Sequence, residues 1–244
     1  MTAPARSTAT PGAWRQAARC VLAAATVALP CAVHAQFAAT LGIANVDRYR
    51  GMGTGAAGPV LRASAMLDLP VGAYGGVSGL WRTRDAGLAS AEAMIGWSGR
   101  LDRLSPAWGW DAAVHRNHYG GDGGRDFSEA MLGLLGPDFT LRSWYAPHYF
   151  GGYAHTFYTE LNASHALDER WHAFGHLGWL RYGPPADYQP HTPDRVDTLL
   201  GIGLTLGNVD LQLARDGIVA GHARSDFDDR RRRAAWILGA SIAF

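Results

Sequence analysis

The chain has 244 residues, and its 22 basic residues against 21 acidic residues give a formal net charge of +1. This near-neutral balance gives no electrostatic case for nucleic-acid binding, so we expect no nucleic-acid partner. Glycine (31) and tryptophan (9) are abundant and only 18% of the residues are charged, a composition that suits a membrane barrel better than an ordinary soluble domain.

The first segment in chain order has the features of a cleaved signal peptide. A start with three arginines and no acidic residue precedes an apolar stretch, residues 20–33, that is too short to span a bilayer as a helix. Small residues ending at Ala35 form a cleavage site. We therefore predict that residues 1–35 are removed, that the mature chain starts at Gln36 and that the protein is exported.

Cleavage changes the composition of what remains. Cys20 and Cys31 leave with the signal peptide, so the mature chain holds no cysteine and cannot be a disulfide scaffold. Three arginines also leave, and the mature charge becomes 19 − 21 = −2. The stretch 36–244 suits one domain, and no run of about 18 apolar residues follows that would predict a transmembrane helix.

The mature chain shows hydrophobic alternation with a period of two, broken at regular intervals by turn residues. Most of these segments have the roughly 9–11 residues that a tilted strand needs to cross a membrane. The predicted strands are 38–46, 60–69, 72–82, 89–99, 108–119, 127–135, 139–146, 155–166, 171–182, 196–206, 209–216 and 233–244. They predict an all-β fold, a transmembrane antiparallel barrel of about twelve strands and of the outer-membrane type.

The connections between these strands alternate in length, which is expected of periplasmic turns and external loops. All nine prolines of the mature chain fall in connections, where a missing N–H breaks no strand ladder. The long connections predicted on the external side are 47–59, 120–126, 147–154, 183–195 and 217–232. The loop 84–88 lies on the same side but is short. Both chain ends are expected on the periplasmic side of a Gram-negative outer membrane.

The last predicted strand has one apolar face, formed by Trp236, Leu238, Ala240, Ile242 and Phe244, and one face of mostly small residues. We expect the apolar face to meet lipid and lipopolysaccharide, and the other face to line the interior. A terminal aromatic on such a strand resembles the signal that bacterial barrel-assembly machinery recognises. Phe244 is therefore expected to bind that machinery.

Tryptophans and Phe244 lie near the ends of the predicted strands. Trp108, Trp171 and Phe244 are on the turn side, and Trp81 and Trp179 are near the loop side. Two aromatic girdles at the membrane interfaces are expected from this placement.

The alternation places ten ionisable residues on the inward faces. An outward position is unfavourable, because an arginine facing lipid near the bilayer midplane would cost roughly 2–4 kcal/mol. Their mixed signs suit a water-filled pore or a closed, salt-bridged plug, and we favour the pore because charges in a lumen commonly tune passage. The predicted pore-lining residues are Arg62, Glu92, Asp111, His115, Glu129, Arg142, Glu160, His172, His176 and Asp210.

A metal site and an enzyme site are weaker interpretations. His172 and His176 share a strand face but stand about 13 Å apart at ~3.3 Å per residue, so they cannot chelate one ion and no metal or cofactor is expected. Ser143, His148 and His155 lie where outer-membrane lipid hydrolases place such residues, but no acidic or amide partner is evident, so we predict no enzyme.

Short segments of the chain resemble the TorF family of porins, a group of bacterial outer-membrane proteins. Residues 47–51 (Asp-Arg-Tyr-Arg-Gly) look like that family's aromatic-Arg-aromatic-Arg-Gly segment, and residues 143–150 resemble its aromatic-rich stretch. Residues 127–129 and 158–160 resemble its repeated aromatic-x-Glu strands.

This resemblance covers most of the mature chain but departs from the family at two positions. Asp47 stands where the family tends to have an aromatic residue, and His148 where it tends to have an acid. The resemblance implies a porin-like barrel and supplies no solute. Our predicted function is passive diffusion of small hydrophilic solutes; a lipid-modifying enzyme and a plugged structural or surface-binding barrel are the alternatives.

Overall fold

The protein was analysed as a computed structural model. The structure describes residues 35–53, 58–103, 105–120, 126–152, 154–183, 194–220 and 234–244. The predicted signal peptide, 1–35, lies outside the described residues except for Ala35. The arginine-rich run 230–233 also lies outside them.

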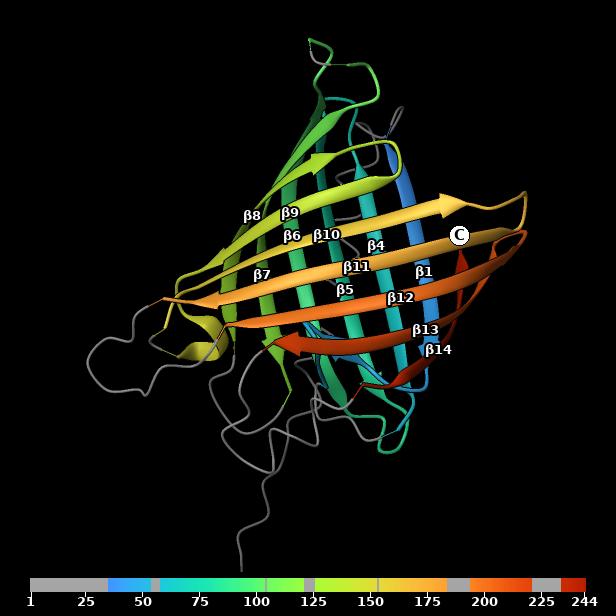
Figure 1. Cartoon of the computed structure of the whole chain (residues 1–244). Helices are drawn as coiled ribbons and strands as arrows, with labels where there is room; N and C mark the ends of the chain where they lie inside the picture. The colour runs from blue at the N-terminus through green and yellow to red at the C-terminus, as the bar shows by residue number, and fades with distance from the viewer. Residues whose placement is uncertain are drawn as a thin grey trace, which may run out of the picture. The chain divides into compact units, whose positions relative to one another are not determined.

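Twelve long strands close into an antiparallel barrel (Figure 1). In chain order they are β1 (Gln36–Ala44), β4 (Val60–Asp68), β5 (Ala73–Arg82), β6 (Leu88–Arg100), β7 (Gly109–Tyr119), β8 (Phe127–Leu135), β9 (Phe139–Ala146), β10 (Thr156–Ala166), β11 (Trp171–Tyr182), β12 (Arg195–Leu206), β13 (Val209–Ala220) and β14 (Trp236–Ala243). The order around the barrel is β1-β14-β13-β12-β11-β10-β9-β8-β7-β6-β5-β4. The predicted fold class is confirmed.

Two shorter elements complete the described chain. A small hairpin, β2 (Arg48–Tyr49) and β3 (Met52–Gly53), lies in the connection from β1 to β4. A single helical turn, η2 (Tyr149–Gly151), lies in the connection from β9 to β10. No helix in the described part of the chain is both long and apolar enough to cross a bilayer.

Most strands begin and end within a few residues of their predicted limits. The largest difference is β13, which was predicted to end at residue 216 and continues to Ala220. Gly217 reads as the start of a loop, yet it pairs with Thr198 of β12 and continues the ladder. Of the nine mature prolines, the five in the described residues lie outside strands, namely Pro59, Pro70, Pro106, Pro137 and Pro147.

The outer face of the barrel is apolar and exposed. Leu200 of β12 is 73% exposed, Ile95 of β6 is 71% exposed, and Trp236 and Leu238 of β14 are each 57% exposed. Proteins in water rarely expose a continuous apolar surface of more than a few hundred Å². A belt that runs around every wall of the barrel is therefore a lipid-facing surface, as outer-membrane barrels have.

Short turns join the strands at one end of the barrel, here called the turn end. In the β10–β11 turn the Asp168 carboxylate accepts the backbone N–H groups of Arg170 and Trp171, each at 2.7 Å. The N–H of Trp171 and then that of Arg170 lower the pKa of Asp168, because both favour its charged form. The opposite end of the barrel, where the longer connections lie, is the loop end.

The inside of the barrel is packed with aromatic rings at the loop end. A buried cluster comprises Phe127, Ala146, Tyr149, Tyr158 and Leu180, from β8, β9, η2, β10 and β11. These residues lie within three positions of the loop-end limit of their strands, or in the η2 turn itself. The core of the molecule is therefore inside the lumen at one end.

Candidate functional site

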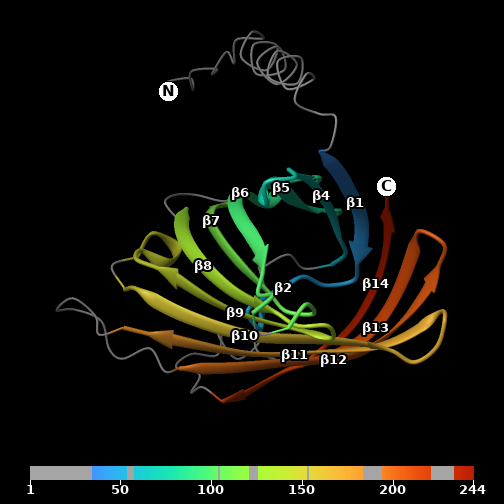
Figure 2. The same cartoon turned by 90° about the horizontal axis from the view of Figure 1, so that it is seen from above.

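The β2–β3 hairpin folds into the lumen, where Figure 2 shows β2 inside the ring of strands. Its two turn residues, Arg50 and Gly51, have φ values of 49° and 73°. A two-residue type I′ turn requires positive φ at both central positions, which explains the Arg-Gly pair. A Cβ on Gly51 would also lie 2.5 Å from the Cβ of Asp197, so the tip of the hairpin lies directly against β12.

Three ion pairs fasten the hairpin segment to three different strands. They are Asp47 with Arg62 of β4 at 2.7 Å, Arg48 with Asp216 of β13 at 2.6 Å, and Arg50 with Glu129 of β8 at 2.6 Å. Around the barrel, β4 and β13 are three strand positions apart, β13 and β8 five, and β8 and β4 four. The hairpin is thus tied to the wall on all sides, and it crosses the lumen.

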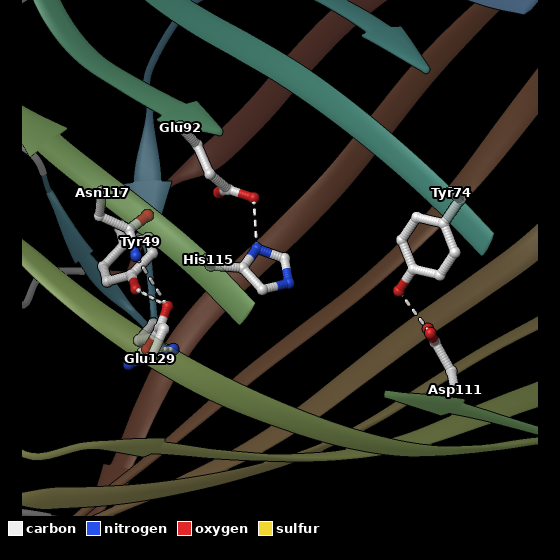
Figure 3. Close-up of polar contacts among 8 residues, drawn as sticks. Tyr49, Tyr74, Glu92, Asp111, His115, Asn117 and Glu129 are labelled. Carbon is white, nitrogen blue, oxygen red and sulfur yellow. Dashed lines mark hydrogen bonds and ion pairs between the residues drawn. The ribbon is translucent and has the colours of Figure 1, made fainter. Parts of the chain in front are cut away.

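Glu129 is the most fully bonded of these carboxylates (Figure 3). It accepts hydrogen bonds from Arg50 at 2.6 Å, from the Asn117 amide at 3.1 Å and from the Tyr49 hydroxyl at 3.3 Å. The Arg50 and Glu129 side chains are only 5% and 3% exposed. A buried carboxylate is tolerated only with such partners, since burial removes its hydration.

Aromatic rings surround the Arg50 guanidinium. Its carbon lies 4.5 Å from the ring centre of Tyr158, 4.8 Å from Tyr49, 5.5 Å from Tyr149 and 5.7 Å from Trp144. Cations are attracted to ring faces within about 6 Å, and more strongly where water is excluded. Glu129 and these rings together hold Arg50 near the loop end of the lumen.

A cavity of about 990 Å³ lies inside the barrel next to the hairpin. It reaches from Arg50 near the loop end to Pro137 in the β8–β9 turn, at the turn end. A second cavity of about 400 Å³ lies beside it, and Glu92, Arg142 and Trp144 line both. The lumen therefore contains a polar space that covers most of the barrel's length.

The ten residues predicted to line the interior have these positions in the structure. Asp111 and His115 line the smaller cavity, and Asp210 lies 3.8 Å from the ring of His172. The other seven line the larger cavity: Arg62, Glu92, Glu129, Arg142, Glu160, His172 and His176. The two-residue alternation of the strands therefore carries each of them to the inner face.

Several of these residues pair with one another across strands. Arg142 lies 3.4 Å from Asp111, which also accepts a hydrogen bond from Tyr74. His115 Nδ1 lies 2.7 Å from a carboxylate oxygen of Glu92, and Figure 3 shows this contact and the Tyr74–Asp111 hydrogen bond. The interior charges are thus largely organised into local pairs.

A further polar network lies between β10, β11 and β12. His176 Nε2 lies 2.8 Å from Asp197 Oδ2, and His176 Nδ1 lies 2.7 Å from Asn162 Oδ1. The Tyr158 hydroxyl lies 3.2 Å from the same Asp197 oxygen and 3.0 Å from His176 Nε2. Asp197 is 3% exposed, so this network is buried in the wall of the cavity.

Sequence reasoning missed several residues of the site. Asp197 and Asp216 lie on inward faces that the alternation of β12 and β13 predicts, so the pattern contained the signal for both. The segment 47–51 was predicted as part of an external loop, and the structure places it inside the lumen instead. Its direction depends on partners such as Glu129, which is far away in the sequence, so local sequence could not reveal it.

The serine and one histidine of the enzyme interpretation contact other residues in the structure. The Ser143 hydroxyl lies on the outer face, 3.1 Å from the hydroxyl of Thr159. The His155 ring packs against Tyr145 and Phe157. Within the described residues no group of three or more His, Cys, Asp or Glu side chains is placed to hold a metal ion.

Comparison with known proteins finds relatives only by structure. No family model and no curated protein sequence matches the chain. A structure of the NanC porin is similar, with a TM-score of 0.56 and 8% identity over 85% of this chain and 99% of that chain. The KdgM porin has a TM-score of 0.54, and KdgM in complex with disordered oligogalacturonate one of 0.52.

These two KdgM structures are 8% and 7% identical to this chain, cover 85% and 86% of it, and are each matched over 99% of their own length. At this level of identity the likeness shows the fold alone, which is that of an outer-membrane porin barrel.

Proposed function

We propose that the protein is a channel of the bacterial outer membrane, through which small hydrophilic solutes diffuse passively. The observation that carries this proposal is the cavity of about 990 Å³ inside the barrel, lined by charged and polar side chains. An apolar outside and a polar inside are the arrangement of barrels that hold water in a membrane. Similar folds in the NanC and KdgM porins support the same function.

The β2–β3 hairpin gives the proposed channel its narrowest region. It crosses the lumen at the loop end and is fastened by ion pairs to β4, β8 and β13. Solutes entering from outside would pass beside the hairpin and then through the wider cavity toward the turn end. The hairpin therefore sets the size limit of the channel in this proposal.

The same proposal includes the resemblance to the TorF family, the export of the protein and its partners in the membrane. We propose that residues 1–35 direct export, that the apolar outer face meets lipid and lipopolysaccharide, and that Phe244 is recognised by barrel-assembly machinery. The ten inward residues would line the route of the solute, and no cofactor takes part.

A plugged barrel is a second candidate, favoured by the aromatic cluster around Phe127 and Tyr149 at the loop end. Liposome swelling distinguishes the two. Liposomes that contain the folded protein should swell in small sugars, and faster when residues 47–53 are replaced by a short Gly-Ser linker. Swelling only after this replacement would favour the plugged barrel, and no swelling in either case would contradict a channel.

A further inference from the structure

The arginines that line the larger cavity are neutralised by carboxylates. Among the described residues, four arginines line the larger cavity, and each is ion-paired to one acidic side chain. The pairs are Arg48–Asp216, Arg50–Glu129, Arg62–Asp47 and Arg142–Asp111. The positive charges of this cavity lining are therefore matched, and Arg195, which is buried at the loop end of β12, lies outside the lining.

Carboxylates of the same cavity outnumber these arginines. Glu92, Glu160 and Asp197 line it, and none of the three has an arginine within ion-pair distance in the part of the chain that the structure describes. Glu92 contacts His115, and Asp197 contacts His176, so neither carboxylate is matched by an arginine. The uncompensated charge of this cavity is therefore negative.

The strand register explains why Glu160 has no arginine partner. One row of inward positions runs across six neighbouring strands, and its members are Asp197, Gly178, Glu160, Arg142, Gly133 and Asp111. Arg142 stands directly opposite Glu160 on β9, yet its guanidinium pairs with Asp111 on the other side. A Cβ on Gly133 would lie 3.2 Å from both Arg142 Cγ and Asp111 Cβ, so the glycine makes room for this pair.

The other side of Glu160 is arranged in the same way. Gly178 lies between Glu160 and Asp197, and a Cβ there would lie 2.8 Å from Asp197 Oδ1 and would also meet the Tyr158 hydroxyl. Tyr158 therefore reaches across the glycine to Asp197. Asp197 Oδ1 itself is buried without a hydrogen-bond partner in the described structure. Glu160 is left facing the cavity, next to a second negative charge.

We infer that the channel selects cations over anions, and that Glu160 is its principal selectivity-determining residue, with Asp197 and Glu92 contributing. This inference rests on the proposed channel function. Uncompensated charges in a narrow, low-dielectric passage concentrate counter-ions and exclude co-ions. The solutes favoured are small cations, inorganic or organic.

The test is the reversal potential of the whole protein in a planar bilayer across a tenfold KCl gradient. The wild type should be more permeable to K⁺ than to Cl⁻, and less selective at high salt because salt screens the charge. Glu160→Gln should lower the permeability ratio roughly threefold, the effect of one unit charge a few ångström from the ion in water. Glu160→Arg should shift it further toward Cl⁻.

Glu169→Gln is the matched control. It removes the same charge from the exposed β10–β11 turn, outside the cavity lining, and should leave the ratio unchanged. Conductance with no preference for K⁺, or an equal effect of the two glutamine variants, would overturn the inference and leave the channel intact. Silence from protein shown to be folded by its gel mobility before and after heating would overturn the proposed function, and the inference with it.

Discussion

Glu129 joins the hairpin to the barrel wall, because Arg50, Tyr49 and Asn117 all donate hydrogen bonds to its carboxylate. At the scale of single residues, this site shows what sets the position of the hairpin. Arg50 and Tyr49 lie 79 and 80 positions from Glu129 in the chain, and the three side chains meet in a space from which water is nearly excluded.

Glu129→Gln should destabilise the protein, because it leaves the Arg50 guanidinium buried without a counter-charge. Breaking a buried ion pair by removing one partner costs about 3–5 kcal/mol. Urea unfolding followed by tryptophan fluorescence measures the loss. Asp102→Asn is the control. The side chains of Arg100 and Asp102 are 66% and 69% exposed, so their ion pair should contribute at most about 1 kcal/mol. Equal losses in the two variants would contradict the burial argument.

Gly51→Ala should displace the hairpin. An L-residue with positive φ costs roughly 1–2 kcal/mol, and here the added methyl group would also collide with Asp197. Gly207→Ala separates the two effects, because Gly207 has a φ of 66° and nothing within 4 Å of its added Cβ. The urea midpoint should fall more for Gly51→Ala than for Gly207→Ala. An equal fall for the two variants would show that backbone strain alone accounts for the loss, without the collision with Asp197.

Where a strand carries a residue, its parity predicts the face on which the side chain lies. Parity predicts Glu160 and Asp210 on inner faces, and the same parity would have found Asp197 and Asp216. It cannot place Arg50, because a residue outside the strands has no alternation to follow. The partners that a side chain selects across the lumen, such as Asp111 for Arg142, depend on room left by glycines and are likewise invisible in one sequence.

At the scale of elements, β14 closes the barrel against β1 with five paired positions, from Thr40 with Ala243 to Ala44 with Gly239. The backbone of Phe244 exchanges hydrogen bonds with Ala39 at 2.9 and 3.3 Å, while Phe244 is 71% exposed. The ring therefore contributes little to the described packing, and its main role in our proposal is recognition during assembly.

Phe244→Ala should reduce the amount of barrel in the outer membrane of living cells while leaving refolding in detergent unchanged, because the backbone bonds to Ala39 remain. Membrane fractionation and gel mobility measure the two quantities. Phe37→Ala is the matched control, since Phe37 lies on the neighbouring strand and is 66% exposed. Equal loss of both variants from the membrane would point to a general effect of the aromatic surface.

The strands themselves were predictable because the lipid outside and the polar lumen impose opposite chemistry on successive residues. The alternation, the turn residues and the prolines together gave twelve strands in the observed order. The limits were wrong where a glycine stands inside a ladder, as Gly217 does in β13. Hydrophobic alternation cannot distinguish such a glycine from the first residue of a loop.

At the scale of the whole molecule, the barrel is asymmetric along its length. The larger cavity reaches the turn end, whereas the hairpin and the aromatic cluster occupy the loop end. An apolar exterior and a charged lumen follow from the sequence pattern. The narrowing follows from a hairpin that the sequence pattern does not place in the lumen. Together these features describe a barrel with a wide chamber toward the turn end and a restricted loop end.

Single-channel recording of the folded protein in a planar bilayer is the most direct test of the proposed channel. We expect discrete current steps whose size rises with salt concentration, because a continuous water path would connect the cavity to both sides. The steps should be small, since the hairpin narrows one end. Complete absence of current from protein that is shown to be folded and inserted would contradict the channel and leave a closed barrel.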